Sequence, residues 1–126
     1  MSTAVTHLRV LVVEDEPLIT MEIEDVIDAL GYQIVGPFAQ LDEALEVAKR
    51  GNFDCAVLDI NIRGGNTYAI AEMLLERGCP FVMATGYSDW SIPTHLASQK
   101  RLTKPYGSVQ LEPELRRLDA EAHATR

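Results

Sequence analysis

Three carboxylates at the ends of two apolar runs are the side chains best suited to chemistry in this chain of 126 residues. Glu14 and Asp15 directly follow the apolar run Leu8–Val13. Asp59 lies at the end of a second run, Asp54–Ile60. Clustered carboxylates repel one another and raise one another's pKa unless a cation joins them. Oxygen ligands completed by water suit Mg²⁺, so the pattern predicts a magnesium site at Glu14, Asp15 and Asp59.

Two further side chains extend this chemistry to a phosphoryl group. Thr85 follows the apolar run Pro80–Ala84, and Lys104 directly precedes Pro105. A lysine would neutralise negative charge, and a threonine hydroxyl would donate a hydrogen bond. Phosphoryl transfer depends mainly on positioning and charge neutralisation, and an aspartate carboxylate can act as the nucleophile that accepts the group. We therefore predict that Asp59 is the nucleophile and that Thr85 and Lys104 surround it.

Such a site needs a scaffold that brings the ends of separate segments together. Short apolar runs alternate with segments of helical periodicity along the chain. We expect strands at residues 8–13, 33–36, 54–60, 80–84 and 101–103, and helices at residues 17–30, 41–50, 67–77 and 111–122. Pro93 leaves room for only about two helical turns near Thr94–Gln99. Pro113 should delay or bend the start of the final helix, and Pro37 should end the second strand.

The order of these elements is βα repeated five times, which favours a parallel sheet with helices on both faces. We predict an α/β fold, the flavodoxin-like doubly wound (βα)5 sheet with strand order 2-1-3-4-5 and a short or irregular fourth helix. In such sheets ligands bind outside the carboxyl ends of the strands. That edge is where Asp15, Asp59, Thr85 and Lys104 would meet.

Composition narrows the function classes. The formal net charge of −8 argues against nucleic acid as a direct partner, and no apolar run reaches the roughly 20 residues that span a bilayer. Cys55 and Cys79 form no CxxC pair and fit two reduced thiols in a cytoplasmic protein. The histidines have no spacing typical of a zinc site. We expect one domain over residues 1–126, without an attached output domain.

The ordered set Glu14-Asp15, Asp59, Thr85 and Lys104-Pro105 resembles the receiver domain of bacterial two-component response regulators. The resemblance covers Leu8 to about Ala122. It implies that a sensor histidine kinase or histidine phosphotransfer protein phosphorylates Asp59 in a Mg²⁺-dependent reaction. It also implies that Asp15, Asp59 and the main-chain carbonyl of Asn61 bind the ion, with Glu14 acting through water. Thr85 and Lys104 would bind the phosphoryl oxygens.

A narrower resemblance concerns the segment Pro80–Tyr87, followed by Pro93 and Lys104-Pro105-Tyr106, which is similar to the "FAT GUY" receivers. Met83 replaces the phenylalanine of that signature. Ordinary receivers carry an aromatic switch residue three positions before the lysine, and that position is Arg101 here. Tyr87 is the candidate replacement.

The leading interpretation is a stand-alone receiver, a signalling protein and not an enzyme, whose interaction surface towards an unknown downstream protein changes on phosphorylation. The alternative is a receiver-like interaction module that works without phosphorylation. A flavodoxin-like cofactor protein is disfavoured because no glycine-rich phosphate loop opens the first helix. A phosphatase of the haloacid dehalogenase type is disfavoured because Asn61 stands where its acid/base aspartate would be. Read singly, the acids of residues 14–16 could serve only the helix N-terminus, and Lys104 could be a surface lysine.

Overall fold

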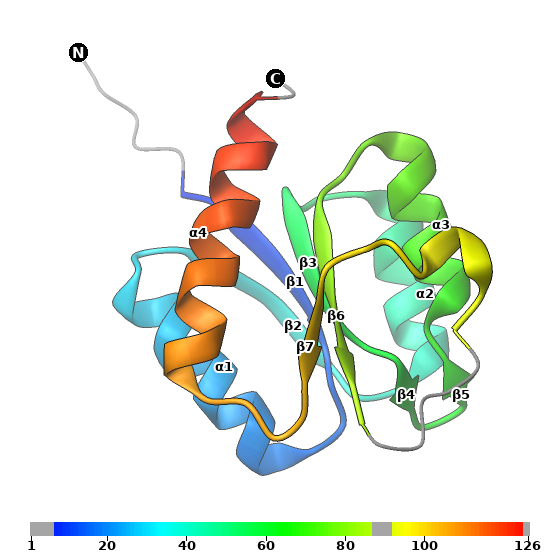
Figure 1. Ribbon diagram of the computed structural model, residues 1–126, viewed down its shortest axis with the longest axis horizontal. Helices are drawn as coiled ribbons and strands as arrows, with labels where there is room; N and C mark the ends of the chain where they lie inside the picture. Colours follow the sequence, from blue (N-terminus) through cyan, green and yellow to red (C-terminus); the bar gives the residue numbers. More distant parts are fainter. Residues whose placement is uncertain (1–6, 87–91, 125–126) are drawn as a thin grey trace.

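The fold is an alternation of strands and helices, described here for residues 7–86 and 92–124 of a computed structural model (Figure 1). The strands are β1 (Arg9–Val13), β2 (Gln33–Phe38), β3 (Cys55–Asp59), β4 (Asn61–Ile62), β5 (Gly65–Asn66), β6 (Phe81–Thr85) and β7 (Arg101–Thr103). The helices are α1 (Pro17–Ala29), α2 (Leu41–Arg50), α3 (Tyr68–Arg77) and α4 (Ser108–Ala124), and the 3₁₀ turn η1 spans Thr94–Leu96. Within this part of the chain, no helix combines the length and apolar character needed to cross a membrane.

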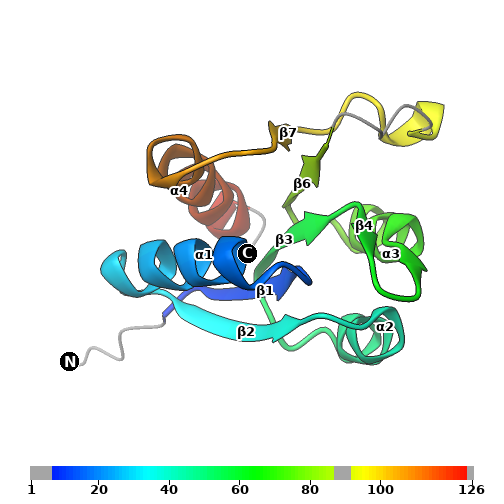
Figure 2. The ribbon, with the colours of Figure 1, turned by 90° about the horizontal axis from the view of Figure 1, so that it is seen from below.

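Five parallel strands form the central sheet in the order β2-β1-β3-β6-β7, which confirms the predicted order 2-1-3-4-5. Helices α1 and α4 cover one face and α2 and α3 the other (Figure 2). Two apolar clusters fill the layers: Val12, Val57 and Leu115 belong to the first, and Leu11, Leu58 and Leu74 to the second. β3 is buried along its whole length, because both of its faces are covered, as a continuous apolar run indicates.

Strand β2 passes through the proline that was expected to end it. The register shifts between Leu11, which pairs with Val35, and Val13, which pairs with Phe38. Gly36 and Pro37 therefore bulge opposite one β1 residue, and Gly36 adopts a φ of 113° that favours glycine. Proline is tolerated there because it lies at a bulge in an edge strand.

Helix α4 begins at Ser108, so of the two effects expected of Pro113, a delayed or a bent start, the delay is wrong. Ser108 N–H donates to Oε1 of Glu22 in α1 at 2.9 Å, and Gly107 N–H donates to Oε1 of Gln110 at 2.8 Å. These contacts satisfy donors at the helix start. The carbonyl that Pro113 cannot bond belongs to Val109, an exposed residue in the first turn of the helix.

The segment between β6 and β7 contains a single described 3₁₀ turn, η1, in place of a full fourth helix. This agrees with the expected short or irregular element, although the turn is shorter than the two helical turns predicted near Thr94–Gln99. Leu96, the last residue of this turn, is fully buried, and His95 Nε2 lies 2.8 Å from Oε2 of Glu72 in α3. Tyr87 lies outside the described residues.

Candidate functional site

Glu14, Asp15 and Asp59 come together at the carboxyl edge of the sheet, as predicted. Each contributes one carboxylate oxygen to a group in which all three atoms lie within 4.8 Å of one another. Glu14 follows β1 and is anchored by its N–H, which donates to the Phe38 carbonyl at 3.0 Å. Asp59 ends β3, the neighbouring strand. Adjacent parallel strands thus deliver the carboxylates to one point.

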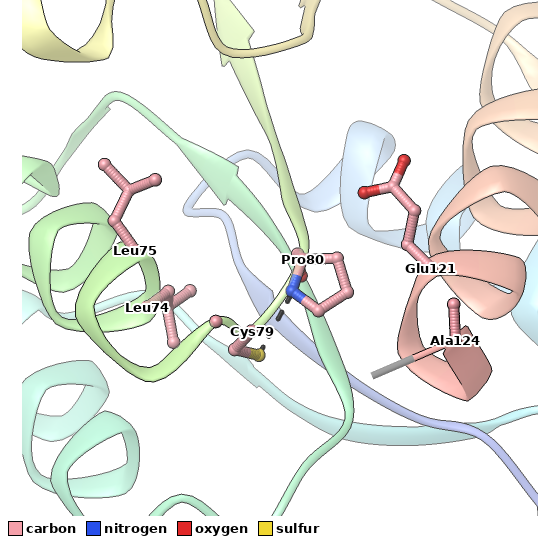
Figure 3. Close-up of a pocket in the computed structure, with 7 residues that line it drawn as sticks. Leu74, Leu75, Cys79, Pro80, Glu121 and Ala124 are labelled. Carbon is pink, nitrogen blue, oxygen red and sulfur yellow. Dashed lines mark hydrogen bonds between the residues drawn. The ribbon is translucent and has the colours of Figure 1, made fainter. Parts of the chain in front are cut away.

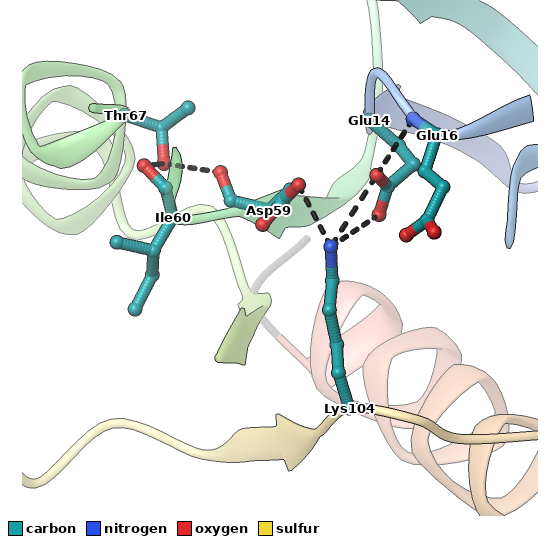
Figure 4. A network of polar contacts seen from close by, with 6 residues as sticks. All are labelled: Glu14, Glu16, Asp59, Ile60, Thr67 and Lys104. Carbon is teal, nitrogen blue, oxygen red and sulfur yellow. Dashed lines mark hydrogen bonds and ion pairs between the residues drawn. The ribbon is translucent and has the colours of Figure 1, made fainter. Parts of the chain in front are cut away.

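Lys104 reaches this group from the end of β7 (Figure 4). Its Nζ lies 2.9 Å from Oδ2 of Asp59 and 3.4 Å from Oε1 of Glu14. Its main-chain N–H donates to the Thr85 carbonyl at 2.8 Å, which holds the end of β7 against β6. One ammonium therefore bridges two buried carboxylates.

The charge of Lys104 does not fully offset the effect of burial on the pKa values of Glu14 and Asp59. Burial, followed by the charge of Asp59, raises the pKa of Glu14 to about 7. Burial also raises the pKa of Asp59, although Lys104 acts in the opposite direction. Burial lowers the pKa of Lys104, but the hydrogen bond and charge of Asp59, together with Glu14, outweigh it and the pKa is raised. Burial thus opposes ionisation of both carboxylates more strongly than the nearby ammonium favours it.

A divalent cation fits this donor set. Oε2 of Glu14 accepts hydrogen bonds from Glu16 N–H at 3.0 Å and from Lys104 Nζ at 3.5 Å. Oε1 is buried and lies 3.4 Å from Lys104 Nζ, but it accepts no hydrogen bond within the described residues. Asp15 is only partly buried, so water can reach the group. Hard oxygen ligands with access for water are what Mg²⁺ requires.

The two remaining predicted residues are placed by the main chain. Thr85 ends β6 and is 9% exposed, one position beyond Ala84, which pairs with Asp59. Asn61 opens a short antiparallel hairpin, β4–β5, that the sequence did not predict. Its main chain hydrogen-bonds the Asp59 carboxylate and lowers the pKa of that group against the effect of burial.

Two further residues lie at this edge to which the sequence analysis gave no role. Thr67, which it treated only as a helix start, is buried and its hydroxyl donates to the Asp59 carbonyl at 2.8 Å. Tyr106 is buried, and its hydroxyl has no hydrogen-bond partner in the described structure. Burial, with Glu14 and Asp59, raises its pKa. A threonine before a helix carries no local signal of this contact, whereas Tyr106 belongs to the Lys104-Pro105-Tyr106 segment of the narrower resemblance.

An apolar cleft of about 270 Å³ lies at the opposite edge of the sheet, between the ends of α3 and α4 (Figure 3). Leu74, Leu75, Pro80 and Ala124 supply most of its wall, with Cys79 and Glu121 beside them. Burial raises the pKa of the Cys79 thiol to about 11, so the thiol stays protonated and weakly nucleophilic at neutral pH. We therefore place the candidate reactive site at the Asp59 edge and not at this cleft.

The buried Glu14 predicts a specific pH dependence in the absence of divalent ions. Folded Glu14 keeps its proton to about pH 7, whereas the unfolded carboxyl loses it near 4.5. The folded state binds more protons between these values, so the free energy of unfolding falls as pH rises through this window. The shift corresponds to on the order of 3 kcal/mol. Urea unfolding in chelator from pH 5 to 8 should show this decline, and Glu14→Gln should flatten it; a slope unchanged in Glu14→Gln would contradict the assignment.

The fold and the acid-lysine site together define a receiver, and a comparison with family models agrees. Residues 10–116 match the response regulator receiver domain model. The chain belongs to the response regulator receiver domain family, whose members act in two-component signalling.

The chain is also similar to individual proteins of this kind. The solution structure of SdrG from Sphingomonas melonis Fr1 is 38% identical, covers 89% of this chain and 96% of that one, and has a TM-score of 0.77. The transcriptional regulatory protein PdtaR of Mycobacterium tuberculosis is 30% identical in an alignment of 111 residues, which covers 85% of this chain and 54% of PdtaR. The chain thus spans about half the length of that curated relative. The receiver domain of sensor histidine kinase PA1611 from Pseudomonas aeruginosa, solved with a magnesium ion coordinated in its active site cleft, is 22% identical, covers 90% of this chain and 98% of that one, and has a TM-score of 0.75.

Proposed function

We propose that this protein accepts a phosphoryl group on Asp59 in a Mg²⁺-dependent reaction and signals by a change of its interaction surface. The observation that carries the proposal is the arrangement around Asp59. Its carboxylate lies at the open end of a fully buried strand, 2.9 Å from Lys104 and grouped with two other acids. A carboxylate in this position serves no packing function, and phosphoryl transfer uses just such positioning and charge neutralisation.

Each residue then has a role in the proposed reaction. One carboxylate oxygen of Asp59 attacks phosphorus, and the bond from phosphorus to the donor's leaving group breaks. Lys104 pairs with the phosphoryl oxygens, and the Thr85 hydroxyl donates a hydrogen bond to them. Asp15, Asp59 and the Asn61 carbonyl would hold Mg²⁺, with Glu14 acting through water. The ion would neutralise charge that develops on the phosphoryl oxygens.

Removal of the metal should lower stability as well as block phosphorylation. Mg²⁺ binding to the folded state at 100 times its Kd adds about 2.7 kcal/mol to the free energy of unfolding. Thermal unfolding at pH 8 with Mg²⁺ and then with excess chelator should show this difference. Asp15→Asn should remove most of the Mg²⁺ effect, and the exposed Asp28→Asn should retain it. Equal Mg²⁺ stabilisation of wild type and Asp15→Asn would place the ion elsewhere.

The partners of the proposed function are those that membership of the receiver family implies. The phosphoryl donor would be a phosphohistidine on a sensor histidine kinase or a histidine phosphotransfer protein in the cytoplasm. The output would pass to a downstream protein through the receiver's own surface, as in a stand-alone receiver.

The direct test is intact-mass analysis after incubation with a small acyl phosphate. We expect one added phosphoryl mass with Mg²⁺ and none with chelator. Amide spectra recorded alongside should show shifts around Thr85 and η1 when the group is present. Failure of every donor, including a kinase, to modify the protein would remove the proposal.

One observation favours a second candidate, a receiver-like module that works without phosphorylation. Arg101, at the usual position of the aromatic switch, is exposed on the edge strand β7. The usual coupling of the threonine to a buried aromatic ring is therefore absent at this position. If Asp59→Asn left partner binding and cellular output unchanged, this second function would replace the first.

A further inference from the structure

Thr67 holds the main chain of the phosphoryl-acceptor residue. It stands directly before α3 and is 1% exposed, but its hydroxyl does not cap that helix. The hydroxyl instead donates to the Asp59 carbonyl at 2.8 Å (Figure 4). Asn66 serves the helix start in its place, because its Oδ1 accepts from Tyr68 N–H at 3.1 Å. The local sequence thus frees the Thr67 hydroxyl for Asp59.

Thr67 contacts two successive peptide units. Its hydroxyl donates to the Asp59 carbonyl at 2.8 Å and, more weakly, to the Ile60 carbonyl at 3.4 Å. Its N–H donates to the Ile60 carbonyl at 2.9 Å. The peptide that contains the Asp59 carbonyl is also held from its other side, because Ile60 N–H donates to the Ala84 carbonyl at 3.1 Å. The peptide after Ile60 ends in Asn61, whose main chain hydrogen-bonds the Asp59 carboxylate. The contacts of Thr67 therefore bear on both peptides that orient this carboxylate.

The Asp59 carbonyl needs this partner because β3 ends at the same residue. β1 pairs with β3 only as far as Leu58. A buried carbonyl without a donor is costly, and a peptide free to rotate would carry the Asp59 side chain with it. A displacement of the reacting atoms by about 1 Å can slow a reaction roughly 100-fold.

We propose that Thr67 is a positioning residue for phosphoryl transfer, which sets the orientation of the Asp59 carboxylate through the two peptides flanking Ile60. This inference rests on the proposed function of Asp59. A purely structural role would make Thr67 matter for stability alone. The positioning role requires in addition that loss of the hydroxyl slow the transfer step itself.

The test compares wild type with Thr67→Val, which keeps the shape, and Thr67→Ser, which keeps the hydroxyl. Tyr32→Phe is the matched control, since it removes one hydrogen bond, to Oδ2 of Asp119 at 3.0 Å, away from the site. With an acyl phosphate and saturating Mg²⁺, we expect Thr67→Val to react roughly 10-fold more slowly at saturating donor, with the half-saturating donor concentration unchanged. Thr67→Ser and Tyr32→Phe should stay within about 2-fold of wild type.

A rate for Thr67→Val equal to that of wild type, or a Thr67→Ser rate as low as that of Thr67→Val, would overturn the inference. If wild type itself takes up no phosphoryl group, the proposed function fails and a second measurement decides on Thr67. The Mg²⁺-induced shift of the Asn61 amide resonance should be strongly reduced in Thr67→Val and retained in Thr67→Ser. An undiminished shift in Thr67→Val would show that the hydroxyl does not orient this site.

Discussion

Asp59→Asn should abolish phosphoryl uptake while the fold remains intact. An amide oxygen is a far poorer nucleophile than a carboxylate, so we expect at least a 1,000-fold fall in rate, equal to roughly 4 kcal/mol in activation free energy. Asparagine keeps the main-chain contacts of Asp59 and removes a charge whose burial raises its pKa. The variant should therefore be no less stable than wild type at pH 8 without metal. Intact-mass kinetics and urea unfolding on the same samples measure both effects.

Asp54→Asn is the matched control for this substitution. Asp54 lies just before β3 as Asp59 ends it, and it is also buried. Its carboxylate accepts from Arg9 N–H at 2.8 Å and pairs with the Arg9 guanidinium at 3.3 Å, at the far edge of the sheet. We expect Asp54→Asn to lose stability and still become phosphorylated. Equal phosphoryl uptake by Asp59→Asn and wild type would move the acceptor to another residue.

Lys104→Met should be the most destabilising substitution of a charged residue at the site. It leaves the buried carboxylates of Glu14 and Asp59 without the ammonium that bridges them. Removing one partner of a buried ion pair costs about 3–5 kcal/mol, and we expect roughly 2–3 kcal/mol at pH 8 in chelator because Lys104 is 20% exposed. At pH 5 the carboxyls can take up protons, so the loss should be much smaller.

Lys100→Met provides the comparison, since this exposed lysine in the same chain segment should change the free energy of unfolding by less than about 0.5 kcal/mol. Urea unfolding of both variants at pH 5 and pH 8 measures the difference. The double variant Asp59→Asn, Lys104→Met should lose less than the sum of the single changes, because the two groups contact each other. If Lys104→Met were no less stable than Lys100→Met at pH 8, the ion pairs of Lys104 with Glu14 and Asp59 would contribute nothing to the free energy of unfolding.

The arrangement of the sheet and the meeting of the four charged residues were predictable because both follow from strand order. Buried strands appear as unbroken apolar runs, and right-handed crossovers leave few orders for five of them. Once the order 2-1-3-4-5 is set, Glu14, Asp59 and Lys104 must end at one edge, and the structure places them within ion-pair distance. Their roles in phosphoryl transfer remain predictions.

The structure differs from the sequence predictions where a contact between two elements outweighs a local sequence signal. Pro37 signals the end of a strand, yet β2 continues through a bulge because it is an edge strand. Pro113 signals a late helix start, yet α4 begins earlier because Glu22, a residue of α1, caps Ser108. In each case the decisive partner lies on another element, where sequence periodicity carries no information about it.

The amino-acid sequence alone determined the order of elements, the class of fold and the set of chemical groups at the carboxyl edge, because hydrophobic periodicity and strand ends are local properties. Only the tertiary structure decided how Asp59 is held. The contact of Thr67 with its carbonyl depends on how the loop after β3 packs. The burial of the Tyr106 hydroxyl without a hydrogen-bond partner among the described residues depends on the loop after β7. Hydrogen bonds of this kind join residues whose spacing in the chain has no characteristic period, so they become visible only when the chain is folded.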